Sequence, residues 1–164
     1  MSRAFVKDGN EDRPDLPERP ISDAPNYVTP EGLRNLREKV EMLAHEHGRL
    51  RETEEDADKL RLAVNERDLR YFQARLDSVI VVDVADAPQD EVHFGATVKT
   101  EDEDGAVGRF TIVGEDEADV SNGKISWLCP LAKALIGSKA GDAVTWTRPA
   151  GSTTLEVLGI GYPN

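Results

Sequence analysis

The sequence predicts an α+β protein in which an antiparallel coiled-coil hairpin precedes a small antiparallel β domain with one short helix. Leucine-rich stretches on both sides of residues 52–58 repeat their apolar positions at spacings of three and four, which is typical of paired helices. From residue 92 onward, short strand-like segments alternate with turns. Strands that follow helices in this way favour an α+β architecture.

The length and charge of the chain limit the kinds of protein that it can be. Its 164 residues are enough for one ordinary domain or two small ones. The net charge of −12 excludes a protein that grips nucleic acid with its whole surface, and it suits a partner with a basic surface or a bound cation. The single cysteine, Cys129, excludes an internal disulfide and a cysteine-rich zinc site.

The apolar segments of the chain are all short. The first residues lack the apolar run of a secretion signal, and no stretch approaches the roughly 20 apolar residues that span a bilayer. We therefore expect a soluble protein of the cytoplasm that has no membrane partner.

Residues 1–28 are predicted to be a disordered, proline-rich arm. Prolines at this density prevent helix and sheet hydrogen bonding, and they lie among charges of both signs. The alternative is a docking arm that uses the apolar side chains of Phe5, Val6 and Ile21.

Residues 29–78 are predicted to form the hairpin. Thr29-Pro30 is a favourable helix start, because a hydroxyl can cap the first turn and proline suits the first helical position. A short connection forces the two helices antiparallel, so that Leu33 pairs near Leu76 and His47 near Leu62. About 20 residues per arm give a rod of about 30 Å. An isolated hairpin of this length is marginal, so we expect something else to hold its base.

The junction between the two helices contains the run ETEEDAD, which holds five carboxylates and no base at residues 52–58. Carboxylates gathered at a hairpin tip repel one another unless a metal or a basic partner offsets them. The candidate functional residues are Glu54, Glu55, Asp56 and Asp58. The alternative is a solvated tip whose negative charges stabilise the first turn of the second helix. Thr53, with Asp56 three residues later, is expected to form a capping box that begins this helix.

Residues 79–91 are predicted to form a strand, VIVVDV, and a polar linker, and residues 92–164 form the β domain. A short helix interrupts the strands at residues 130–136 and ends at Gly137. Because no base lies near Cys129 in the sequence, we expect that thiol to behave as a small buried hydrophobe.

Several segments match a known family in order and spacing, among them TPEGL at 29–33, FGATV at 94–98, IVGEDEAD at 112–119 and PLA at 130–132. On these segments the chain resembles the Gre-type bacterial transcript cleavage factors, the GreA/GreB family, over about residues 27–162. The resemblance implies an N-terminal antiparallel coiled coil and a C-terminal domain of FK506-binding-protein-like (FKBP-like) fold.

The resemblance also implies a mode of action. Family members dock the C-terminal domain on the rim of the RNA polymerase secondary channel and insert the coiled coil. Two tip carboxylates then share a second Mg²⁺ with the polymerase, and backtracked RNA is cleaved at its 3′ end. Such a factor is not an enzyme alone, binds no metal stably alone and has no cofactor or small-molecule ligand of its own. Hard oxygen ligands suit Mg²⁺, which can generate a hydroxide nucleophile.

Three departures from the family keep alternatives open. The family's tip signature is absent, and the hairpin is shorter by roughly one heptad in each arm, or about 10 Å of reach. In the loop that contacts the polymerase, Leu128-Cys129-Pro130 keeps the proline of the family motif and loses its polar residues. The alternatives are a channel-occupying regulator that does not cleave, and an interaction module related to the regulators of nucleoside diphosphate kinase.

Overall fold

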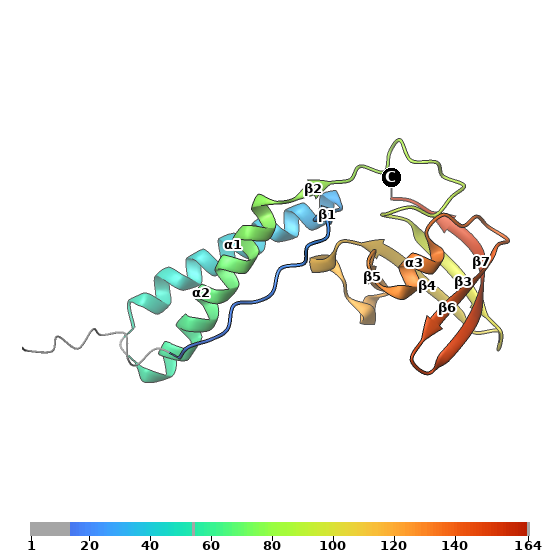
Figure 1. Cartoon of the computed structure of the whole chain (residues 1–164). Coiled ribbons are helices and arrows are strands. Elements are labelled where there is room, and N and C mark those ends of the chain that lie inside the picture. The colour runs from blue at the N-terminus through green and yellow to red at the C-terminus, as the bar shows by residue number, and fades with distance from the viewer. Residues whose placement is uncertain (1–13, 54, 164) are drawn as a thin grey trace, which may run out of the picture. The chain divides into compact units, whose positions relative to one another are not determined.

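The computed structural model describes residues 14–53 and 55–163, and it divides into two compact units (Figure 1). We call residues 14–24 and 36–77 the helical unit, and residues 25–35 and 78–163 the sheet unit. The first turn of the first helix therefore belongs with the β domain and not with the hairpin. None of the helices within the described ranges is both long and apolar enough to cross a membrane.

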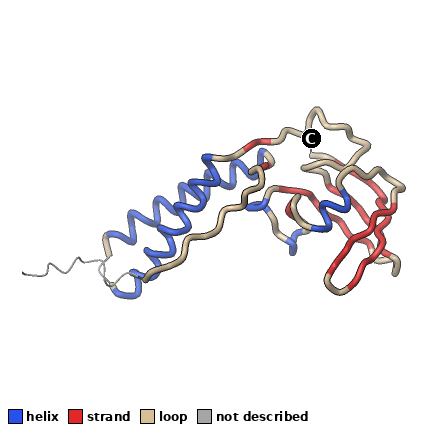
Figure 2. The backbone as a smooth tube through the Cα atoms, in the orientation of Figure 1, coloured by secondary structure: helices blue, strands red, loops and turns tan. Residues whose placement is uncertain are grey.

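Two long helices, α1 (Pro30–Arg51) and α2 (Asp56–Asp77), run antiparallel, as the sequence predicts (Figure 2). The Asn65 side chain donates a hydrogen bond of 3.0 Å to the carbonyl of Leu43. The His47 Nε2 atom lies 3.1 Å from a carboxylate oxygen of Glu66, close to the predicted level of Leu62. On α1, the side chains that face α2 and are fully buried recur every seven residues, at Leu36, Leu43 and Leu50.

The arm differs from its predicted disorder over the part that the structure describes. Residues 14–24 lie extended, and Glu18 and Arg19 form ion pairs with Arg70 and Asp68 of α2. Prolines exclude helix and ladder bonding, but they allow an extended chain to dock through its side chains. Phe5 and Val6, the apolar residues of the alternative docking arm, lie outside the described residues, and Ile21 is exposed.

The predicted capping box at the start of α2 is wrong. The Thr53 hydroxyl donates to the carbonyl of Leu50 at 3.0 Å, and α2 begins at Asp56. The last carbonyls of a helix have no partner within it, so the end of α1 offers this hydroxyl a nearby acceptor.

The sheet unit contains a five-stranded sheet with the order β5-β4-β3-β7-β6. Its strands are β3 (Thr97–Asp102), β4 (Val107–Val113), β5 (Lys124–Ser126), β6 (Ala143–Arg148) and β7 (Gly151–Gly161). The short helix α3 (Pro130–Leu135) lies between β5 and β6 in the chain, as predicted. The core gathers residues from α3 and the sheet, including Val98, Ile112, Leu131, Leu135 and Val157.

The prediction of an entirely antiparallel β domain is wrong at one edge. Strand β5 pairs with β4 in parallel, with Ile112 opposite Ile125. The connection between them contains two 3₁₀ helices, η1 (Glu115–Glu117) and η2 (Val120–Asn122), which the sequence did not indicate. Parallel strands need a connection that carries the chain back to the end of the sheet where the first strand begins, and this segment provides it. A tight hairpin would have made β4 and β5 antiparallel.

The predicted strand over residues 79–84 is reduced to β2 (Ile80–Val81), which pairs in parallel with β1 (Tyr27–Val28). The amide of Ile80 donates to the carbonyl of Asn26 at 2.8 Å, and the amide of Val82 donates to the carbonyl of Val28 at 2.9 Å. The segments that enter α1 and leave α2 are thus joined by a ladder inside the sheet unit. This ladder is one of two sets of hydrogen bonds that fix the base of the hairpin, which the sequence predicts to be marginal on its own.

The second set of hydrogen bonds at the base of the hairpin caps the N-terminus of α1. The Thr29 hydroxyl accepts from the amide of Gly32 at 3.0 Å, as in a capping box. In an ordinary capping box, the side chain of an acidic residue at the position of Gly32 would accept a hydrogen bond from the amide of Thr29. Here Glu117 of η1 accepts it at 3.0 Å, and the Thr29 hydroxyl also donates to this carboxylate. The amide of Gly114 donates to the same Glu117 oxygen at 3.2 Å.

We expect Gly32→Ala to lower the free energy of unfolding by about 1–2 kcal/mol, although alanine is the better helix former by about 1 kcal/mol. A Cβ atom at Gly32 would overlap the carboxylate of Glu117. Because that carboxylate is held by Thr29 and Gly114, its displacement breaks those hydrogen bonds. Urea denaturation of the full chain measures the change.

Gly48→Ala is the matched control on the same helix. No atom lies within 4 Å of a Cβ atom at Gly48, so the substitution should raise the free energy of unfolding by about 0.5–1 kcal/mol. A gain of stability at both positions would contradict the assignment of Glu117 as the cap of α1.

Candidate functional site

The junction between α1 and α2 places the acidic run at the tip of the hairpin, which we define as residues 52–58. The amides of Glu52 and Thr53 still donate to carbonyls of the last turn of α1, at 3.3 and 3.4 Å. The carbonyl of Glu55 accepts from the amide of Asp58 at 3.0 Å, so Glu55 directly precedes the first turn of α2. Glu54 lies outside the described residues.

The two aspartates of the tip differ in exposure, although both lie in the first turn of α2. The Asp56 side chain is 90% exposed, whereas that of Asp58 is 15% exposed. They do not lie on opposite sides of the connection, because the connection ends at Glu55. Glu55 is exposed as well, so Glu55 and Asp56 are the described candidate carboxylates that face solvent freely.

Each aspartate pairs with a base three residues further along α2. The Lys59 Nζ atom lies 2.8 Å from Asp56, and the Arg61 Nη1 atom lies 3.2 Å from Asp58. Arg61 also reaches Glu46 of α1 at 3.6 Å. The acidic run contains no base, but residues three apart are neighbours on a helix, and this spacing could have revealed both pairs from the sequence.

The contact with Lys59 changes the acidity of Asp56. The hydrogen bond from Lys59, followed by the charge of its ammonium group, holds the pKa of the Asp56 carboxyl below its usual value. The lowered pKa keeps the Asp56 carboxylate ionised down to a lower pH than an ordinary aspartate. The stabilising contact is present at neutral pH and is lost only when the pH falls through this lowered pKa.

The tip carries oxygen donors of the kind that bind hard cations. Carboxylate oxygens are the ligands that Mg²⁺ prefers. Within residues 14–53 and 55–163, no group of three or more His, Cys, Asp or Glu side chains is arranged to hold a metal ion.

A second candidate surface is the segment Leu128-Cys129-Pro130 before α3 in the sheet unit. Leu128 and Cys129 are half-buried and Pro130 is exposed. Cys129 packs partly buried against the core of the sheet unit, and its Sγ atom also caps α3 by accepting from the amide of Ala132 at 3.4 Å, a role that the sequence did not indicate. The preceding Trp127 packs edge-on against Tyr27, with ring centroids 5.0 Å apart.

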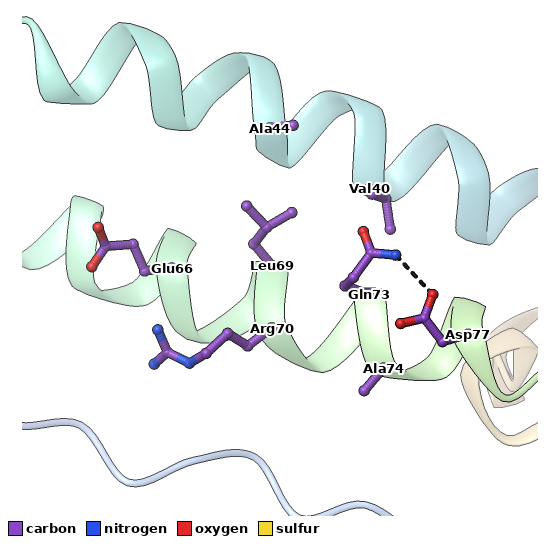
Figure 3. A pocket seen from close by; sticks show the side chains of 8 residues that line it. All are labelled: Val40, Ala44, Glu66, Leu69, Arg70, Gln73, Ala74 and Asp77. Atoms are coloured by element: carbon purple, nitrogen blue, oxygen red, sulfur yellow. Dashed lines mark hydrogen bonds between the residues drawn. The ribbon is translucent and has the colours of Figure 1, made fainter.

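An open groove of about 720 Å³ lies along the hairpin, between α1 and α2 (Figure 3). Apolar side chains from both helices face it, and Gln73 and Asp77 of α2 are joined by a hydrogen bond of 3.0 Å at its edge. The residues that line it are Val40, Ala44, Glu66, Leu69, Arg70, Gln73, Ala74 and Asp77. The tip carboxylates are not among these residues.

We expect the pKa of Asp56 to rise when Lys59 is replaced by glutamine, because the hydrogen bond and the positive charge that stabilise the carboxylate are both removed. An NMR titration of the side-chain carboxyl carbons measures this pKa in both proteins. Arg49→Gln, which removes a base near the tip without touching Asp56, is the control. An unchanged pKa of Asp56 in Lys59→Gln would contradict the ion pair.

Comparison with known proteins identifies the family. A family model described as transcription elongation factor GreA/GreB, C-terminal, matches residues 87–162. A transcription elongation factor GreA of Desulfovibrio desulfuricans is 40% identical over 121 residues, which cover 73% of this chain and 75% of that protein. A transcription elongation factor GreB of Neisseria meningitidis serogroup B is 33% identical over 154 residues, which cover 84% and 94% of the two chains.

Among solved structures, a GreA/GreB elongation factor from Nitrosomonas europaea aligns over 83% of this chain and 98% of that chain, with 25% identity and a TM-score of 0.42. The sequence identities to the curated relatives extend well beyond the matched C-terminal region, since those alignments cover about three quarters or more of this chain. The chain therefore belongs to the GreA/GreB family of transcription elongation factors.

Proposed function

We propose that this protein binds RNA polymerase, inserts the α1–α2 hairpin into the secondary channel and stimulates cleavage of backtracked RNA. The observation that carries the proposal is the exposed Asp56 carboxylate at the tip of an antiparallel helical hairpin in a member of this family. Helices of 22 residues each give the hairpin a reach of about 33 Å. A narrow rod of this kind can carry charge into a cavity that a globular domain could not enter.

The chemistry at the tip would be assistance to a metal site of the polymerase. Glu55 and Asp56 are the exposed carboxylates that could contribute oxygen ligands to a shared Mg²⁺, which supplies an activated water and neutralises a leaving oxygen. Asp56 contacts Lys59 through Oδ1, and a cation at the tip would bind the same carboxylate group. Because the ligand set is partial, hydrolysis belongs to the polymerase and not to this chain alone.

The segment Leu128-Cys129-Pro130 is the proposed contact with the rim of the channel. The cap by Cys129 and the proline at the first helical position fix this segment at the start of α3. Its exposed surface is less polar than the family motif, so contact there would depend on packing of Leu128 and Pro130 more than on hydrogen bonds.

A second candidate function is a regulator that occupies the channel and does not cleave RNA. The specific observation in its favour is that Lys59 and Arg61 neutralise Asp56 and Asp58. A cation at the tip would have to compete with the Lys59 ammonium group, only 2.8 Å from Asp56. Such a regulator would block access without donating ligands.

The purified wild-type protein should shorten the RNA in stalled, backtracked elongation complexes. Replacing Glu55 by glutamine and Asp56 by asparagine together should reduce the cleavage rate by about 10- to 100-fold, the usual loss when a metal site is disturbed, with polymerase affinity nearly unchanged. Gel analysis of the labelled transcript gives the rate. Glu41→Gln, an exposed carboxylate on α1 away from the tip, is the matched control and should retain full activity.

If the wild-type protein binds polymerase and yields no shortened transcript at any Mg²⁺ concentration, the cleavage proposal is wrong. Competition with an authentic cleavage factor then tests the second candidate, since a channel-occupying protein should suppress cleavage by that factor in a concentration-dependent way. Failure to bind polymerase at all would instead identify an interaction module with another partner.

A further inference from the structure

The helical unit has a thin apolar core. Among the residues that the structure describes, its fully buried apolar side chains, Leu36, Leu43 and Leu50, all come from α1. On α2, the fully buried side chains among those that the structure describes are polar, namely Asn65 and Arg75. A two-helix hairpin with so little buried apolar surface on one helix is marginal without additional contacts.

The arm supplies contacts of this kind on the outer side of α2. The Arg70 guanidinium donates to both carboxylate oxygens of Glu18, at 2.6 Å from Nη2 and 3.1 Å from Nε. Figure 3 shows Arg70 projecting from α2 at the edge of the groove. Such a forked pair is the strongest kind of exposed ion pair, and it holds the pKa of Glu18 below its usual value.

The neighbouring arm residue adds a second attachment. The Arg19 guanidinium lies 4.0 Å from the ring centroid of Tyr71, and its Nη1 atom lies 3.5 Å from Asp68. A cation over an aromatic face and a nearby carboxylate both favour this position. Two adjacent arm residues thus bind one turn of α2.

The order of charges selects one register for the arm. Glu18 faces Arg70, and Arg19 faces Asp68. An arm that docked at another position along α2 would lose these pairs and bring like charges together. Pro17 and Pro20 flank the pair and restrict the chain before it docks. That restriction lowers the conformational entropy lost on docking.

We propose that residues 14–24 are an ionic strap that stabilises the middle of α2. The strap lies outside the segment that matches the family model, residues 87–162, and it does not depend on polymerase binding. Because its bonds are exposed and charged, it is weakened by salt, while the apolar contacts of α1 and the sheet unit are not. The strap therefore links the rigidity of the hairpin to ionic strength.

Hydrogen exchange of the full-length protein tests the strap at the amides of residues 66–74. At about 0.05 M salt, Glu18→Ala and Arg70→Ala should each speed exchange there by about threefold, with the sheet unit unchanged. The double variant should exchange no faster than either single variant, because each single change already breaks the pair. Asp23→Asn, elsewhere in the arm, is the matched control and should behave as wild type.

Charge reversal gives an independent measurement. Glu18→Arg should speed exchange more than Glu18→Ala at low salt, because it adds repulsion from Arg70, and the two variants should converge at about 1 M salt. Exchange in Glu18→Ala equal to that in Asp23→Asn would overturn the proposal. So would additive effects in the double variant, or a difference between Glu18→Arg and Glu18→Ala that persists at high salt.

Discussion

The start of α1 depends on a carboxylate that comes from 88 residues further along the chain. The first amides of a helix have no partner within it, and here Thr29 satisfies one while Glu117 satisfies the amide of Thr29 itself. Gly32 is required at the third position because any side chain there would occupy the space of this carboxylate. The same residues explain why the first turn of α1 belongs to the sheet unit, where the β1–β2 ladder also fixes the segments that enter and leave the hairpin.

At the tip of the hairpin, ion pairs with nearby bases offset part of the repulsion among the carboxylates. Five carboxylates within seven residues would destabilise a helix junction, but Lys59 and Arg61 neutralise two of them one turn into α2. This arrangement keeps the tip acidic and exposed while limiting its electrostatic cost. It also defines the chemical question for this family member, which is whether Asp56 can exchange its contact with Lys59 for a metal ion held by a larger partner.

The hairpin has a thin buried core among the residues that the structure describes. Leu36, Leu43 and Leu50 form a single row of buried side chains, and Asn65 places a polar group in the interface opposite Leu43. A buried polar residue in a helical seam lowers stability but favours one register, because any shift would leave its amide without the Leu43 carbonyl. The register in turn decides which residues stand at the tip.

The sequence by itself determined the features that local patterns encode. Thr29-Pro30 predicted the start of α1, the leucine spacing predicted two helices, and the segments at 94–98 and 112–119 pointed to the family. Only the tertiary structure decided that β5 runs parallel to β4, that Glu117 caps α1 and that residues 14–24 dock on α2. Helix starts and heptads depend on neighbours a few residues apart, whereas these three features depend on groups brought together by folding, which no local pattern records.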